Sequence, residues 1–97
     1  MSKVGENMEK SDNVIFVGKK PIMAYVLAVV TQLNSGKDEV HVKARGQSIS
    51  KAVDVVEIVK NKFMPDVKVA SIDIGTDVLE VEKDTINVSR IDIIIKK

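Results

Sequence analysis

The chain has 97 residues, enough for one domain with a modest core. Its net charge at pH 7 is only +1, which excludes a strong global field, so a binding site for an anion must be a local basic patch. Cysteine is absent, which excludes disulfides, thiolate catalysis and thiolate metal sites. No apolar run approaches the roughly 18 residues of a membrane span, and the N-terminus lacks a signal-peptide core, so we expect a soluble intracellular protein without membrane contact.

The first third of the chain contains an arm, a strand and a helix. Residues 1–12 are polar with no apolar period, so we expect a flexible arm before a single domain that spans residues 13–97. The apolar run 14–17 predicts a short buried strand. Residues 21–34 predict a helix, because Pro21 favours the first turn. This helix is apolar nearly all round, which indicates packing against more than its own sheet.

A second strand and a second helix follow. Residues 39–44 alternate between apolar and polar side chains, as in a half-buried strand. Ser48 or Ser50 offers an N-cap for the helix, whose apolar stripe continues to Phe63. Pro65 then predicts the end of this helix.

The last third predicts two strands. Residues 67–74 form the third strand, with a bulge because the apolar phase slips within it. Residues 87–96 form the fourth, and the polar segment 82–85 reads as the hairpin tip. The order β-α-β-α-β-β predicts an α/β fold of the two-layer α+β type, in which two helices accompany a mixed four-stranded sheet. Its first two strands should be parallel, with a right-handed crossover.

Two basic loops follow the predicted parallel strands. Gly18-Lys19-Lys20 follows the first strand, and Arg45-Gly46-Gln47-Ser48 follows the second. Such loops meet at one edge of a sheet, where open α/β sheets bind ligands. Cations are disfavoured at a helix N-terminus, whereas phosphate is favoured there. Paired lysines after a strand are ordinarily solvated charge, but a second basic loop at the same edge favours an anion site.

Other chemistry finds little support in the sequence. Neither a Walker A motif nor GxGxxG is present, so no nucleotide cofactor is expected. His41 is the only histidine and is predicted to lie on a solvent-facing strand position. The acidic residues of the hairpin lack the spacing of a calcium loop, so we predict no metal site and a solvated hairpin. No acid, base or nucleophile accompanies the lysines, so we expect neither a catalytic site nor an enzyme.

Three stretches together resemble a known family. GKKPIMAYVLAV, KARGQSISKAVDVVEIVKNKF and SRIDIIIKK are similar to the Alba family of archaeal DNA- and RNA-binding chromatin proteins. The resemblance implies a fold similar to the C-terminal domain of bacterial translation initiation factor three. It also implies a homodimer, formed by the helices and late strands of two subunits, and a cytoplasmic, nucleoid-associated location on the chromosome.

The resemblance also implies site residues. Lys19, Lys20 and Arg45 would be the main phosphate contacts on duplex DNA, and Lys19 would be the candidate for acetylation. Lys83 would lie on the hairpin arm that follows the minor groove. Dimers would associate side by side on DNA through Asn61, Lys62 and Phe63. Phe63 alternatively belongs to the core, on the stripe of the second helix.

Two departures from the family pattern bear on binding. Gln47 stands where many members have a second basic residue, and the predicted hairpin is acidic around Lys83. We therefore expect weaker non-specific DNA binding than in strongly basic members, with some base preference through Gln47. The expected function is to coat or compact duplex DNA. Binding of structured RNA is the alternative, and a small phosphorylated ligand or a purely structural assembly module is more remote.

Overall fold

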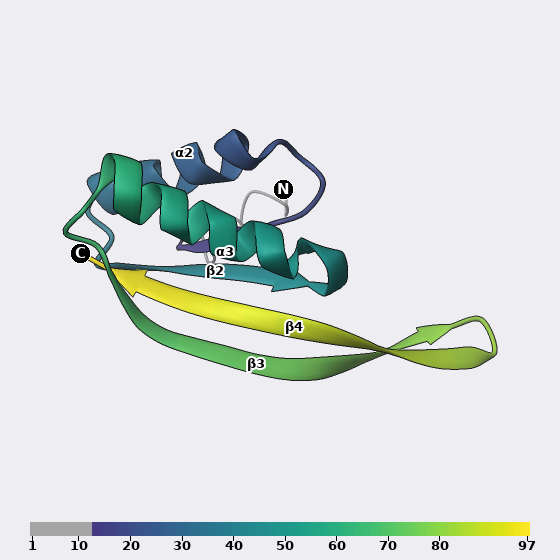
Figure 1. Cartoon of the computed structure of the whole chain (residues 1–97). Coiled ribbons are helices and arrows are strands. Elements are labelled where there is room, and N and C mark those ends of the chain that lie inside the picture. Colours follow the sequence, from purple (N-terminus) through teal and green to yellow (C-terminus); the bar gives the residue numbers. More distant parts are fainter. Residues whose placement is uncertain (1–12) are drawn as a thin grey trace, which may run out of the picture.

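The computed structural model describes residues 13–97 as a four-stranded sheet with two helices on one face (Figure 1). The predicted arm, residues 1–12, lies outside the described residues. In chain order the elements are β1 (Val14–Phe16), α2 (Ile22–Asn34), β2 (Glu39–Arg45), a 3-10 turn (Gly46–Ser48), α3 (Ile49–Ile58), a π-helical turn (Val59–Phe63), β3 (Lys68–Val81) and β4 (Asp84–Lys96).

The sheet has the order β1-β2-β4-β3. Strand β1 pairs in parallel with β2, with Phe16 opposite Lys43, while β4 is antiparallel to both β2 and β3. The predicted mixed sheet and its parallel first pair are confirmed. The predicted bulge is confirmed as well, because the register of β3 against β4 shifts between Val69 and Ser71.

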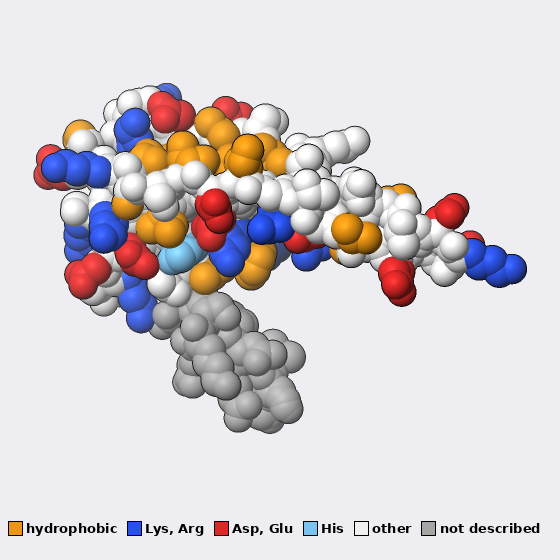
Figure 2. Space-filling model, turned by 90° about the horizontal axis from the view of Figure 1, so that it is seen from below, with side chains coloured by type: hydrophobic (Ala, Val, Ile, Leu, Met, Phe, Trp, Pro, Cys, Tyr) orange, Lys and Arg blue, Asp and Glu red, His pale blue; other side chains and the backbone are white. Residues whose placement is uncertain are grey.

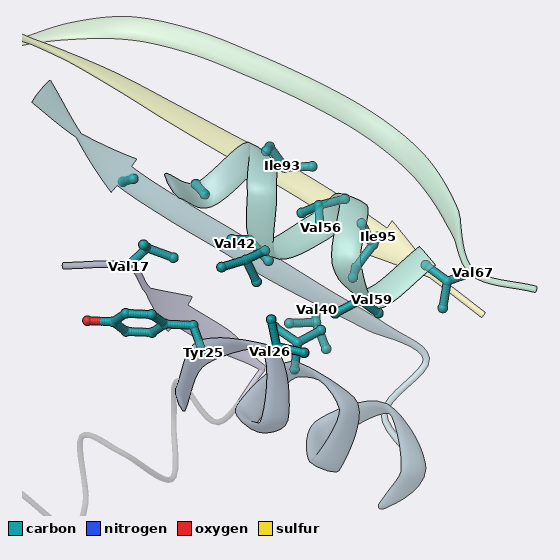
Figure 3. Close-up of a cluster of buried hydrophobic side chains, with 14 of the residues drawn as sticks. Val17, Tyr25, Val26, Val40, Val42, Val56, Val59, Val67, Ile93 and Ile95 are labelled. Carbon is teal, nitrogen blue, oxygen red and sulfur yellow. The ribbon is translucent and has the colours of Figure 1, made fainter. Parts of the chain in front are cut away.

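The core lies between the helices and the sheet and is aliphatic apart from Tyr25 (Figure 3). Alternate residues of β2 point toward the helices, as the sequence predicted. Ile91, Ile93 and Ile95 do the same on β4. The largest fully buried side chains are Leu33, Ile95, Val26, Val29, Val40, Val42, Val55 and Val59.

The opposite side of the sheet, which we call the open face, is covered by no helix or strand of residues 13–97 (Figure 1). The prediction of a buried first strand was therefore wrong in part, since Val14 and Ile15 are half-buried and Phe16 is 68% exposed. Val17 is buried against the helices, but Phe16 points to the other side of the strand. The sequence did not show which side chains alternate between the two faces, because all four residues of the run 14–17 are apolar.

The hairpin is longer than predicted. Strand β3 reaches Val81 rather than residue 74, and β4 begins at Asp84 rather than residue 87, with Glu82-Lys83 as a two-residue turn. Residues 84–89 of β4 have no partner in β2. In this region β3 and β4 pair only with each other and project from the rest of the fold as a two-stranded hairpin (Figure 1). No second layer imposes an alternating apolar pattern there, and the sequence signal for a strand is weak.

The helix starts also differ in detail. Pro21 lies just before α2 rather than within it. Ser48 occupies the N-cap position of α3, but its side chain makes no capping hydrogen bond, contrary to the prediction. The preceding 3-10 turn leads the chain into α3 instead. The helical segment ends at Phe63, two residues before Pro65, as the sequence indicated.

We predict a large difference between two leucines of α2. Leu33 is fully buried and Leu27 is 53% exposed. Leu33→Ala should lower the free energy of unfolding by about 2–5 kcal/mol, because it leaves a cavity. Leu27→Ala should change it by only about 0.5 kcal/mol. Urea unfolding monitored by circular dichroism measures both, and equal losses would contradict the assignment of the core.

Candidate functional site

The two basic loops lie at one edge of the sheet. Because β1 and β2 run parallel, both chains leave the sheet at their carboxyl ends on the same side. Lys19 of the first loop and Arg45 at the end of β2 line one groove, together with Gly18 and Ser48. Lys20 is not among the residues that line this groove. Lys19 and Arg45 therefore lie close together, as the sequence predicted for the two loops, whereas Lys20 does not join them in this groove.

The first loop is held in place by two side chains. The Tyr25 hydroxyl accepts hydrogen bonds from the backbone N–H groups of Gly18 (2.9 Å) and Lys20 (3.0 Å). The Lys51 ammonium donates to the carbonyl oxygens of the same two residues, at 2.8 and 2.9 Å. It also lies 5.9 Å from the centre of the Tyr25 ring. The loop is therefore fixed on both its N–H and its C=O groups.

Sequence reasoning missed both of these residues. The apolar pattern of residues 21–34 includes Tyr25, and the sequence pattern gives Lys51 no role. A tyrosine on a buried stripe carries a hydroxyl that needs a partner, so its presence was the available signal. The sequence could not supply the partner, because Lys51 is 33 residues distant from Gly18.

Lys19 and Lys20 themselves have no carboxylate partner within residues 13–97. The first turn of α2 contains no acidic residue either. Lys51 brings a third ammonium to the same loop. Three cations therefore gather at the N-terminus of α2, where the helix dipole is also positive. An anion bound here would interact favourably with the three ammonium groups and with the helix dipole.

Electrostatics at the loop also act on Tyr25. Burial by itself raises the pKa of its hydroxyl, because burial disfavours the phenolate. The N–H groups of Lys20 and Gly18 and the positive charges of Lys51 and Lys20 lower it more, so the pKa lies below its usual value of about 10. The lowered pKa therefore reflects first the two backbone N–H groups and then the two ammonium groups around the hydroxyl.

Arg45 differs from the two lysines because it already has a partner. Its Nε lies 3.0 Å from Asp77 on β3, and the same carboxylate lies 2.9 Å from Arg90. The sequence predicted a solvated acidic hairpin, and for Asp77 this is wrong, since its side chain is only 27% exposed. Exposed ion pairs of this kind are worth about 0–1 kcal/mol each.

The other predicted contacts are more scattered. Gln47 is exposed and lines a separate hollow with Asn87 and Val88 of the hairpin. Lys83 lies in the turn at the far end of the hairpin, between Glu82 and Asp84 in the chain. Side chains of both charge signs are visible at this end of the molecule (Figure 2). The structure therefore does not bring Lys83 to the two loops. The roles of Gln47 and Lys83 in binding nucleic acid remain predictions.

Asn61, Lys62 and Phe63 lie together on the π-helical turn that ends the second helical segment. Asn61 donates to Glu57 one turn earlier, at 3.5 Å. Phe63 is 41% exposed, so the surface reading fits it better than the core reading. Its part in association between dimers stays a prediction.

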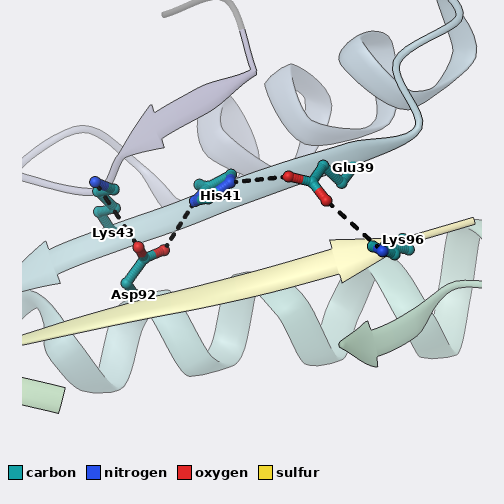
Figure 4. Close-up of polar contacts among 5 residues, drawn as sticks. All are labelled: Glu39, His41, Lys43, Asp92 and Lys96. Carbon is teal, nitrogen blue, oxygen red and sulfur yellow. Dashed lines mark hydrogen bonds and ion pairs between the residues drawn. The ribbon is translucent and has the colours of Figure 1, made fainter. Parts of the chain in front are cut away.

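The open face carries a network of opposite charges (Figure 4). His41 lies between Glu39 (3.2 Å) and Asp92 (3.4 Å), while Lys43 and Lys96 extend the chain of contacts at each end. His41 is on the predicted side of β2 but is half-buried rather than fully solvated. In the described part of the chain, no group of acidic and histidine side chains has the arrangement of a metal site. Among residues 13–97, no helix is long and apolar enough to cross a bilayer.

Comparison with known proteins identifies the family. A family model described as Alba matches residues 13–76, which is most of the domain. The chain belongs to the Alba family. It is 56% identical over 87 residues to DNA/RNA-binding protein Alba 1 of Archaeoglobus fulgidus, covering 90% of this chain and 98% of that one. It is 52% identical to DNA/RNA-binding protein Alba of Thermoplasma acidophilum, covering 89% and 97%.

Solved structures agree. Alba from Thermoplasma volcanium superimposes with a TM-score of 0.84 at 53% identity, covering 88% of this chain and all of that one. ALBA1 from Trypanosoma brucei gives a TM-score of 0.74 at 31% identity, covering 89% and 69%. The family and fold expected from the sequence are thus confirmed. The Alba relatives are named as DNA/RNA-binding proteins and not as enzymes.

The pKa of Tyr25 can be measured directly, because the chain has one tyrosine and no tryptophan. Titration of phenolate absorbance should give a midpoint below about 10. Lys51→Met should raise the midpoint, since it removes a positive charge, whereas Lys62→Met should leave it unchanged. A wild-type midpoint at or above the ordinary value would contradict the loop geometry. Because the folded pKa is depressed, the stability of the wild type relative to Tyr25→Phe should rise as pH increases from that midpoint toward the unfolded value.

Proposed function

We propose that the protein binds nucleic acid through the phosphate backbone, with double-stranded DNA as its main ligand. The observation that carries this proposal is the pair Lys19 and Lys20, which has no carboxylate partner within residues 13–97 and lies on a loop fixed by Tyr25 and Lys51. Ammonium groups act as point charges toward phosphate. The names of the Alba relatives support the same ligand class.

The chemistry of the surface favours backbone contacts over base reading. The basic residues are nearly all lysine, and the exceptions, Arg45 and Arg90, share a carboxylate. Net charge is only +1, and Lys43 and Lys96 on the open face each have a carboxylate partner, so fewer cations are available to phosphate than the number of lysines suggests. We infer modest non-specific affinity with a small salt dependence. Gln47 and Lys83 would add contacts beyond the loops.

Structured RNA is the alternative ligand. It offers the same phosphates, and the relatives are named for both nucleic acids. Single strands are less suited to this surface, because a stacking platform needs several aromatic side chains and the chain has one Tyr and two Phe. A bound mononucleotide would instead support the remote reading of a small phosphorylated ligand.

We further propose that the protein acts as a homodimer through β3. This strand is at the edge of the sheet, and its chief neighbour is β4. Ile72, Ile74 and Val78 point to the helix side of the sheet but lie beyond the helices, and Ile74 is 74% exposed. A long apolar edge strand without a cover favours association. A second copy of the chain would supply that cover and bring two sets of basic loops together.

Assembly on DNA would extend from this dimer. Asn61, Lys62 and Phe63 form an exposed group that suits contact between neighbouring dimers. Repeated contacts of this kind would coat or compact the duplex, as expected of a nucleoid-associated chromatin protein in the cytoplasm. Lys19 is exposed and open to acetylation, which would remove one of the charges that bind phosphate.

The binding proposal predicts a loss of salt-dependent affinity in Lys19→Glu/Lys20→Glu. Fluorescence anisotropy with duplex DNA across a salt series measures it, since each neutralised phosphate contributes about −0.9 to the log–log slope. Lys68→Glu/Lys97→Glu is the matched control: it makes the same change of net charge at exposed lysines at the opposite end of the sheet. If both variants lose equal affinity, or if the wild-type slope is flat, the loop is not the site.

The dimer proposal predicts that Ile74→Lys converts the protein to a monomer. A lysine buried in an apolar interface is costly, and a symmetric contact through β3 would bury one lysine from each copy. Sedimentation equilibrium gives the mass. Phe16→Ser, at an equally exposed apolar side chain on the other edge strand, should leave the dimer intact. A monomeric wild type, or a dimer that survives Ile74→Lys, would contradict the proposal.

A further inference from the structure

One carboxylate on β3 serves two arginines from two other strands. Arg45 ends β2, and Arg90 lies directly opposite it on β4. Asp77 receives both, with its Oδ2 at 3.0 Å from Arg45 Nε and its Oδ1 at 2.9 Å from an Arg90 terminal nitrogen. Two like charges directly opposite each other on a sheet are normally unfavourable. The carboxylate between them relieves this repulsion.

The backbone is adapted to this arrangement. The Arg90 side chain lies across β3 and also donates to the carbonyl oxygen of Thr76, at 3.2 Å. A Cβ atom at Gly75 would lie 2.6 Å from the guanidinium carbon of Arg90, which is too close for any contact. A strand glycine often marks a close approach of this kind. Gly75 therefore makes room for Arg90 to reach Asp77.

The cluster also lies beside the basic loop. Arg45, Arg90 and Asp77 line the same groove as Lys19. The side chains of Arg45 and Arg90 are 59% and 44% exposed, so their remaining N–H groups are accessible from solvent. Guanidinium groups bind carboxylate and phosphate oxygens with the same donors. The side chains that line the groove include four cations and three carboxylates, so the groove keeps a net positive charge that attracts a further anion.

We propose that Arg45 and Arg90 form a paired site for a backbone phosphate, and that Asp77 occupies this site in the free protein as an internal competitor. The inference rests on the proposed function and adds two residues to it. Arg90 becomes a contact that neither the sequence nor the family resemblance indicated. Asp77 becomes the residue that limits the affinity for nucleic acid. Its carboxylate occupies N–H groups of both arginines, and a phosphate must either displace it from them or bind beside its negative charge.

The alternative is an ordinary cross-strand ion pair that only supports the base of the hairpin. The two readings differ in what removal of the carboxylate does. A supporting pair gives a less stable hairpin and unchanged binding. A competitor gives tighter binding, because the donors of two arginines become available at once.

The experiment compares Asp77→Asn with Asp73→Asn. Both substitutions remove one negative charge from β3, and both carboxylates line the same groove. Asp73, however, has no arginine partner within residues 13–97. Duplex DNA affinity is measured by fluorescence anisotropy across a salt series. We expect several-fold tighter binding for Asp77→Asn, with a slope more negative by about 0.9 for one further neutralised phosphate. Asp73→Asn should show a smaller gain and an unchanged slope.

A second variant assigns the gain to Arg90. In the Asp77→Asn background, Arg90→Gln should cancel the added slope, whereas in the wild type it should have little effect, since Asp77 already holds Arg90. This difference is a coupling between the two positions, read from the double-mutant cycle. A gain that persists without Arg90 would overturn its assignment as a contact. Equal gains from the Asp73 and Asp77 variants, or no gain from either, would overturn the role of Asp77.

Failure of this inference is distinguishable from failure of the proposed function. A wild-type slope that disappears in Lys19→Glu/Lys20→Glu, with no response to Asp77→Asn, overturns the paired site alone. A wild type that fails to bind while Asp77→Asn binds through Arg90 supports the competitor and shifts the site away from the lysines. Absence of binding by the wild type and by Asp77→Asn overturns both.

Discussion

The parallel pairing of β1 with β2 is the constraint on which the rest of the site depends. It brings the carboxyl ends of two strands to one edge, so that the Lys19-Lys20 loop and Arg45 arise side by side from positions 25 residues apart in the chain. Helix α2 must cross over the sheet to connect the two strands, and its N-terminus therefore lies at the same edge. The positive charge of this edge therefore depends on the topology of the backbone, which brings the basic residues and the helix N-terminus together.

Opposite charges then decide which cations are available. On the open face, Lys43, Arg45, Arg90 and Lys96 each have a carboxylate within reach. The loop lysines have none among residues 13–97, and Lys51 is directed at backbone carbonyl oxygens. The positive charge that stays available at this edge is thus that of the loop, although the net charge of the protein is almost zero. Polyanions with regularly spaced charges suit a site of this kind.

One-sided coverage of the sheet has a second consequence. Two helices cover β1, β2 and β4, but β3 lies beyond them, and the hairpin continues past the end of β2 (Figure 1). The molecule is accordingly elongated, measuring 47 by 33 by 24 Å along its principal axes. The apolar side chains that remain exposed on β3 are those that a single chain cannot bury. Self-association and nucleic-acid binding thus use different parts of one incomplete two-layer fold.

Local patterns in the sequence were enough to predict the helices and strands that bury one face against the core. The alternation in residues 39–44, the phase slip near residue 70 and the stop before Pro65 all reflect local rules of strand and helix, and the structure follows them. The same rules failed for the hairpin beyond residue 74. Those strands pair with each other and with no second layer, so no buried face imposes a period on them.

The sequence by itself determined the family, the order of elements and the edge at which the basic loops meet. These follow from short-range periodicity and from the chirality of parallel connections. Only the tertiary structure decided which charges are paired. Lys51 contacts Gly18 and Lys20 from more than 30 residues away, and Asp77 reaches Arg45 only because the bulged register of β3 on β4 brings it there. Contacts across strands depend on register, and register is set by packing of the whole sheet rather than by any local segment.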